Sequence, residues 1–190
     1  MRPVTRESLL DYVTYEERRE GIRRRVFAVK APRRVHVGSL LTFLFENTET
    51  IRYQVQEMMR AERTVKESDI LHELETYNEL LGGPGELGCT LLIEIDDPAE
   101  RARKLAAWIE LPWHLYVAVP ACTGRGLEKV YARFDERQVG ETRLSSVHYL
   151  KFDTGGRCPS AIGADLAGEL EVETELDAAQ RAALAEDLAP

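Results

Sequence analysis

Carboxylates and one histidine gather in a short stretch of the chain. The candidate metal ligands are Glu57, Glu62, His72 and Glu75. Carboxylate oxygens and an imidazole, presented from neighbouring helical turns, suit iron, manganese or zinc. The order of His72 and Glu75 reverses the Glu-x-x-His pair of di-iron helical bundles, and the sequence has no second such pair. Metal binding is therefore expected only if another subunit or the rest of the chain covers the face that carries His72.

The apolar period of residues 47–81 shows which of these side chains would point inward. The period is helical, and the breaker GGPG follows, so the stretch predicts a helical hairpin. On its first helix Glu62 falls within the apolar stripe, which predicts a buried carboxylate. Glu57, His72 and Glu75 fall outside the stripes and point away from the core.

The same stretch has two further interpretations. Glu46, Arg52, Tyr53 and Gln54 offer a carboxylate, a guanidinium, a phenol and an amide that suit a small polar ligand, with Glu62 joining them in a pocket. The alternative is an ordinary solvated helix face with one hydrogen-bonded buried glutamate. The sequence leaves metal site, ligand site and solvated face open.

The three cysteines form no metal-binding motif. Cys89, Cys122 and Cys158 are more than thirty residues apart, and an odd number of cysteines suits a reducing compartment. Cys89 lies in a strand-like run and is expected to be a buried apolar residue. Cys122 and Cys158 lie in loops, and no neighbouring base or helix end marks either as reactive.

The charges are distributed unevenly along the chain. The net charge is −8, yet arginines crowd the segment 18–34. Clustered arginine attracts phosphate or an acidic partner. Carboxylates three or four residues before the arginines instead favour a solvated helix stabilised by ion pairs. No aromatic residues alternate with the arginines, so binding to single-stranded nucleic acid is disfavoured but not excluded.

Composition places the chain among globular proteins. It has 190 residues, of which 44% are hydrophobic and 31% charged. No stretch approaches the roughly 18 apolar residues of a membrane span, and the first residues have no apolar core typical of a secretory signal. We therefore expect a cytoplasmic protein without a membrane partner.

The predicted fold is α+β, with a helical N-terminal half and the helical hairpin packed on a mixed sheet of about five to seven strands. One domain is expected over residues 1–190, with a basic helical segment at 1–33 and an α+β body at 34–190. The run 90–119 predicts a β-α-β unit whose strands run parallel if they are neighbours. Besides the hairpin, helices are predicted at 5–12, 15–29, 98–110 and 177–188, and strands at 34–37, 40–45, 90–95, 114–119, 130–134, 147–152 and 170–175.

Several stretches resemble a bacterial family of uncharacterised proteins, a domain-of-unknown-function family. They are FENTETIRYQVQEMMRAE, ILHELETYNELL, ELGCTLLIEID, SSVHYLKFD and DAAQRAALAEDL. The family signature falls on Glu46, Asn47, Tyr53, Gln54, Glu57, Glu62, His72 and Asn78. Members are often encoded beside rubrerythrin and an iron–sulfur protein with CCG motifs. The resemblance therefore implies peroxide defence or iron-dependent redox chemistry, with a redox partner such as rubrerythrin.

Three functions are compatible with these observations. The first is a metal-binding or accessory protein in a redox or oxidative-stress system, with iron, manganese or zinc as the metal. The second is a nucleic-acid or acidic-partner binding module that uses the Arg-rich N-terminal helix. The third is an enzyme acting on a small molecule through a reaction that the sequence does not name. A homo-oligomer is compatible with each.

Overall fold

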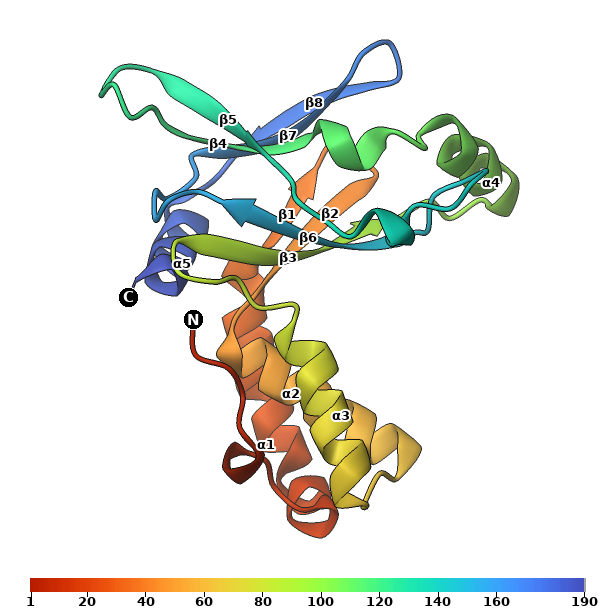
Figure 1. Cartoon of the computed structure of the whole chain (residues 1–190), viewed down its shortest axis with the longest axis vertical. Helices are drawn as coiled ribbons and strands as arrows, with labels where there is room; N and C mark the ends of the chain where they lie inside the picture. The colour runs from red at the N-terminus through yellow and green to blue at the C-terminus, as the bar shows by residue number, and fades with distance from the viewer. Residues whose placement is uncertain (190) are drawn as a thin grey trace.

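The computed structural model describes residues 1–189 as two lobes, one of helices and one built mainly of strands (Figure 1). The helices are α1 (Tyr12–Lys30), α2 (Thr48–Glu62), α3 (Glu67–Asn78), α4 (Pro98–Ala107) and α5 (Ala178–Leu188). The strands are β1 (Arg34–Val37), β2 (Leu41–Glu46), β3 (Glu86–Ile93), β4 (Leu115–Pro120), β5 (Leu127–Tyr131), β6 (Val147–Asp153), β7 (Ala161–Leu166) and β8 (Leu170–Glu175). The α+β class predicted from the sequence is confirmed.

The strands form two sheets rather than one. Their orders are β1-β2-β3-β6 and β5-β4-β7-β8, four strands in each, and every pairing is antiparallel. The expectation of a single mixed sheet is corrected accordingly. The expected β-α-β unit is corrected too, because β3 and β4 lie in different sheets and α4 carries the chain from one sheet to the other.

The largest hydrophobic core lies among the strands of both sheets. It contains Phe43, Leu91, Trp108, Val117 and Ile162, each almost completely buried. β2 is buried along nearly its whole length, so its apolar run is covered on both faces. Burial of this apolar surface is the main force that holds the two sheets together.

The helical lobe has a second, smaller core. Ile51 and Val55 of α2 pack there with Ile70 and Leu74 of α3, which confirms the helical hairpin. α1 packs against α2. Asp11 caps α1, its carboxylate accepting from the backbone N–H groups of the first turn. The helix predicted at 5–12 is therefore wrong: that segment holds only a single 3-10 turn, and α1 begins at its end.

The two lobes meet where η2 (Ala31–Arg33), a 3-10 turn at the end of α1, packs against α5. The chain enters the first sheet directly after η2, and α2 begins just beyond β2. The N-terminal segment lies close to the end of α5 at this place (Figure 1). Segments distant in sequence therefore converge at the junction. None of the described helices is both long and apolar enough to cross a membrane.

Candidate ligand-binding site at the junction of the two lobes

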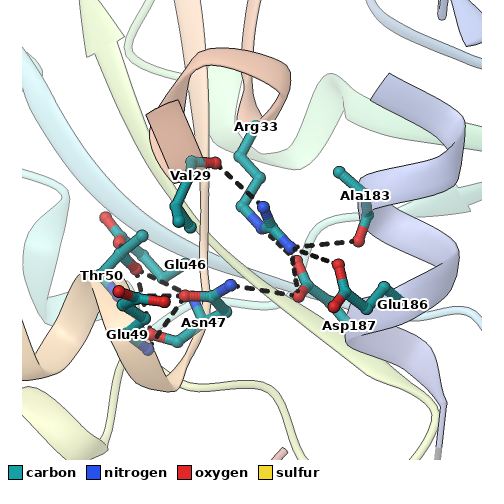
Figure 2. Close-up of polar contacts among 9 residues, drawn as sticks. All are labelled: Val29, Arg33, Glu46, Asn47, Glu49, Thr50, Ala183, Glu186 and Asp187. Carbon is teal, nitrogen blue, oxygen red and sulfur yellow. Dashed lines mark hydrogen bonds and ion pairs between the residues drawn. The ribbon is translucent and has the colours of Figure 1, made fainter. Parts of the chain in front are cut away.

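A buried ion pair joins the end of the first helix to the last helix. Arg33 of η2 donates from Nε to Asp187 Oδ2 over 2.7 Å and from Nη2 to Asp187 Oδ1 over 2.8 Å. Both side chains are buried. Burial opposes the charge of the guanidinium, but the ion pair with Asp187 outweighs it, so the pKa of Arg33 is raised. Nη1 also donates to the Val29 carbonyl, which fixes the guanidinium plane (Figure 2).

Asn47 extends this ion pair to the start of α2. Its Oδ1 accepts from the backbone N–H groups of Glu49 and Thr50, both over 3.0 Å, and so caps the helix. Its Nδ2 donates to Asp187 Oδ1 over 3.3 Å. One amide thus holds the N-terminus of α2 and the end of α5 at the same point (Figure 2).

Glu46 completes the contacts on the sheet side. Its Oε2 accepts from Thr50 Oγ1 over 2.6 Å, and its Oε1 accepts from Thr90 Oγ1 of β3 over 3.1 Å. The side chain is buried with both carboxylate oxygens hydrogen-bonded. We call Arg33, Glu46, Asn47, Thr50 and Asp187 the junction network. It fixes the relative position of η2, β2, α2 and α5.

A hollow of about 930 Å³ lies beside this network. Its walls come from the N-terminal residues, the start of α2, the end of α5, the turn before β3 and the loop after β6. Three glycines, Gly85, Gly155 and Gly156, line it with φ angles of +74°, +60° and +78°. The Gly85 carbonyl accepts from the N–H groups of Thr154 and Gly156, each over 3.1 Å, so the two loops are held together.

The charged lining of the hollow is mainly acidic. Glu49, Glu186 and Asp187 line it together with Arg2 and with Met1, which carries an amino terminus. Asp187 is paired with Arg33, and Glu49 is paired with Arg25 over 2.9 Å. Glu186 lies 3.4 Å from Arg33, and its side chain is 80% exposed. Glu186 is therefore the lining carboxylate most open to a ligand.

The predicted ligand-binding residues are divided between different places. Glu46 belongs to the junction network. Arg52 and Tyr53 line a second, smaller hollow between α1 and α2. Gln54 lies next to the Tyr77 side chain on α3. The pocket expected from Glu46, Gln54 and Glu62 is not formed, because Glu62 is exposed near the end of α2 rather than buried in its apolar stripe.

The four predicted metal ligands do not come together. Glu57 accepts two hydrogen bonds from Arg19, each over 2.8 Å, and one from the Tyr15 hydroxyl over 2.6 Å. Glu62 and His72 line a shallow hollow at the turn between α2 and α3, and Glu75 is exposed on α3. In residues 1–189 no three His, Cys, Asp or Glu side chains form a group that could hold a metal ion.

The arginines and cysteines of the chain have defined surroundings. Arg19, Arg25 and Arg33 are each engaged by a carboxylate of another element, whereas Arg18, Arg24 and Arg34 of the same segment are exposed. Cys89 is fully buried, as expected, and burial raises the pKa of its thiol. Cys122 is exposed.

Glu46 is the one member of the junction network that the sequence predicts as a site residue. Asn47 belongs to the family signature, and Arg33, Thr50 and Asp187 are not predicted. In the sequence Arg33 is one of several arginines of the basic N-terminal segment. The sequence pattern could have indicated that Asp187 is buried, because it shares one face of an amphipathic helix with Ala183, Leu184 and Leu188. A carboxylate on such a face requires a buried partner, but the identity of that partner depends on the tertiary fold.

Comparison with known proteins gives the relatives of this fold. The profile of a family described as "Protein of unknown function (DUF3501)" matches residues 3–188. The crystal structure of a novel protein of unknown function from Burkholderia pseudomallei superposes with a TM-score of 0.86 at 30% sequence identity, over 99% of this chain and 100% of that one. No curated protein sequence matches. The chain belongs to the DUF3501 family of proteins of unknown function.

Proposed function

We propose that the chain is a small-molecule binding protein whose ligand occupies the hollow at the junction of the two lobes. The observation that carries this proposal is the convergence of five segments, distant in sequence, on one hollow of about 930 Å³. That volume lies within the usual range of ligand pockets, about 300–1,000 Å³. The hydrogen-bonded junction network holds one side of the hollow in place before a ligand arrives, which lowers the entropic cost of binding.

The charge of the lining indicates the ligand class. Asp187 and Glu49 are paired with Arg33 and Arg25, whereas Glu186 shares Arg33 with Asp187 and its side chain is 80% exposed. A charge-assisted hydrogen bond to a carboxylate is about twice as strong as a neutral one. The ligand is therefore a polar molecule that presents an amino or guanidino group to Glu186.

The family resemblance supplies a setting for this binding activity. An accessory role in a redox or peroxide-defence system is supported by the gene neighbours that the resemblance implies. The accessory role is tested by measuring whether the purified chain binds purified rubrerythrin from the same source. Saturable binding supports the accessory role, and its absence over a wide concentration range contradicts it.

The ligand proposal is tested with amine probes. Agmatine and putrescine are titrated into the purified protein by calorimetry, with 1,4-butanediol as an uncharged counterpart of putrescine. The blocking variant is Gly155→Asn, because φ at Gly155 is +60° and a Cβ there meets nothing within 4 Å. Asn tolerates this left-handed conformation better than most residues. The matched control is Gly168→Asn in the turn between β7 and β8, where φ is +75° and the surroundings are equally open.

The expected result is saturable binding of at least one amine, lost in Gly155→Asn and in Glu186→Gln and retained in Gly168→Asn. The butanediol does not bind. Equal binding by Gly155→Asn and Gly168→Asn would place the site elsewhere and overturn the proposal. Native mass spectrometry of the untreated protein provides a second readout, since a bound amine adds a defined mass that the Gly155→Asn variant lacks.

A further inference from the structure

A second hollow, of about 220 Å³, lies between α1 and α2. Its polar side is formed by Arg25, Glu49 and Arg52, and its apolar side includes Ile22 and Val26. Tyr53 contributes a buried ring to the lining. The hollow therefore has a charged end and an apolar wall, the two parts of a site for an amphipathic small molecule.

Two arginines from different helices converge on one carboxylate at the charged end. Arg25 Nε donates to Glu49 Oε1 over 2.9 Å, and Arg52 Nη2 lies 3.9 Å from the same oxygen. The two guanidinium groups and the one carboxylate together carry a net charge of +1. Lys30 adds a further cation near the hollow, with its Nζ 5.6 Å from the centre of the Tyr53 ring. The second guanidinium is only loosely held by Glu49 and has donors to spare.

The N-terminal segment is held against this hollow by Gln56. The Leu10 N–H donates to Gln56 Oε1 over 2.7 Å, and Gln56 Nε2 donates to the Leu10 carbonyl over 3.2 Å. Gln56 is buried, so this pair of bonds is shielded from water. Ser8 and Leu10 consequently form a fixed part of the lining rather than a loose tail.

We infer that this hollow binds a small organic carboxylate, whose anionic group lies between Arg25 and Arg52 and whose apolar body packs against Ile22 and Val26. The Glu49 carboxylate contacts the same two guanidinium groups, so it competes with the carboxylate of the ligand for them. An apolar cavity of about 150 Å³ holds a benzene ring, so a hollow of this size takes an aromatic or short-chain acid. Arginine is suited to this role because its planar fork matches carboxylate geometry.

The experiment is a calorimetric titration of the full chain with benzoate, with benzamide as the uncharged counterpart of the same shape. Benzoate is expected to bind saturably and benzamide to bind at least about tenfold more weakly. Arg52→Gln and Arg25→Gln each weaken benzoate binding by about tenfold or more. Arg24→Gln, exposed on the same helix and outside the lining, leaves the affinity unchanged.

Glu49→Gln gives the sharpest result, because its effect has the opposite sign. Removing the competing carboxylate leaves both guanidinium groups free, so benzoate binding tightens. Weaker binding in Glu49→Gln, an equal loss in Arg24→Gln, or no saturable benzoate binding would each overturn the inference. Thermal unfolding of every variant shows whether a loss of binding reflects a loss of folding.

The two hollows share Glu49 in their linings, but separate variants distinguish benzoate binding from the proposed amine binding. Gly155→Asn changes only the junction hollow, so it is expected to abolish amine binding and to leave benzoate binding unchanged. Arg52→Gln is expected to do the reverse, because Arg52 does not line the junction hollow. A protein that binds benzoate but no amine would sustain the inference while contradicting the proposed function.

Discussion

Several charged side chains in this chain are engaged by partners within the fold, and this determines which residues are open to a ligand. Glu57 has its two oxygens bonded by Arg19 and Tyr15, and Asp187 is held by Arg33 and Asn47. Residue type and spacing indicate a possible ligand. They do not show whether a partner from another element has already satisfied it, and that depends on long-range contacts.

Glu57 is therefore expected to act in stability. The side chains of Glu57 and Arg19 are each 21% exposed. Substituting Glu57→Gln removes their ion pair and is expected to lower the free energy of unfolding by about 1–2 kcal/mol at neutral pH. The hydrogen bonds from Arg19 are the main reason that the pKa of Glu57 is lowered. Urea denaturation measures the loss, and the exposed Glu17→Gln on α1 is the control, with little expected effect.

The acid dependence of this difference follows from the sign of the pKa shift. A carboxylate with a lowered folded pKa stabilises the protein fully above its unfolded pKa and loses that contribution as the pH falls through the folded pKa. The gap between wild type and Glu57→Gln should therefore narrow in acid. A gap that persists unchanged at a pH below the folded pKa would show that the ion pair is not its source.

At the scale of elements, the sequence predicts what depends on local pattern. The α2–α3 hairpin, α5 and the strand β8 follow from periodicity and turn residues. The sequence does not predict β7, because AIGADL holds a single β-branched residue, Ile162, and no aromatic residue. The sequence also could not show that β3 and β4 belong to different sheets, since the pairing of strands separated by long connections leaves no local sequence pattern.

Gly163 shows why β7 departs from the usual strand composition. A Cβ at this position would lie 2.6 Å from the Tyr116 hydroxyl oxygen and 2.6 Å from the Val172 carbonyl oxygen. Tyr116 lies across the glycine, and its hydroxyl donates to Glu173 of β8 over 2.8 Å. The absent side chain is what allows one tyrosine to connect β4, β7 and β8.

Substituting Gly163→Ala is thus expected to destabilise the protein by about 1–3 kcal/mol, because a backbone oxygen is among the clashing atoms. Gly21→Ala in the middle of α1 should have the opposite sign. A Cβ there meets nothing within 4 Å, and alanine favours the helix over glycine by about 1 kcal/mol. Denaturant midpoints of the two variants provide the measurement, and a shift in the same direction for both would contradict this account.

For the whole molecule, the junction network contributes to the coupling between the two lobes. Each lobe has its own hydrophobic core. The single domain expected from the sequence therefore requires contacts strong enough to couple them. Arg33 and Asp187 join the end of α1 to α5, and Asn47 joins α5 to α2. Removing one partner of a buried ion pair typically costs about 3–5 kcal/mol, because the other charge is left buried and unpaired.

Two probes separate the lobes in an unfolding experiment. Both tryptophans, Trp108 and Trp113, lie between α4 and β4, so their fluorescence reports on the lobe of sheets. Far-UV circular dichroism reports chiefly on α1, α2 and α3, which hold most of the helical residues. For a single cooperative unit the two urea transitions coincide. In Asp187→Asn both the fluorescence and the circular dichroism transition are expected at lower urea concentration, with the free energy of unfolding reduced by about 3 kcal/mol. Two separate transitions in the wild-type protein would show that the lobes are independent domains and that the junction hollow opens without global unfolding.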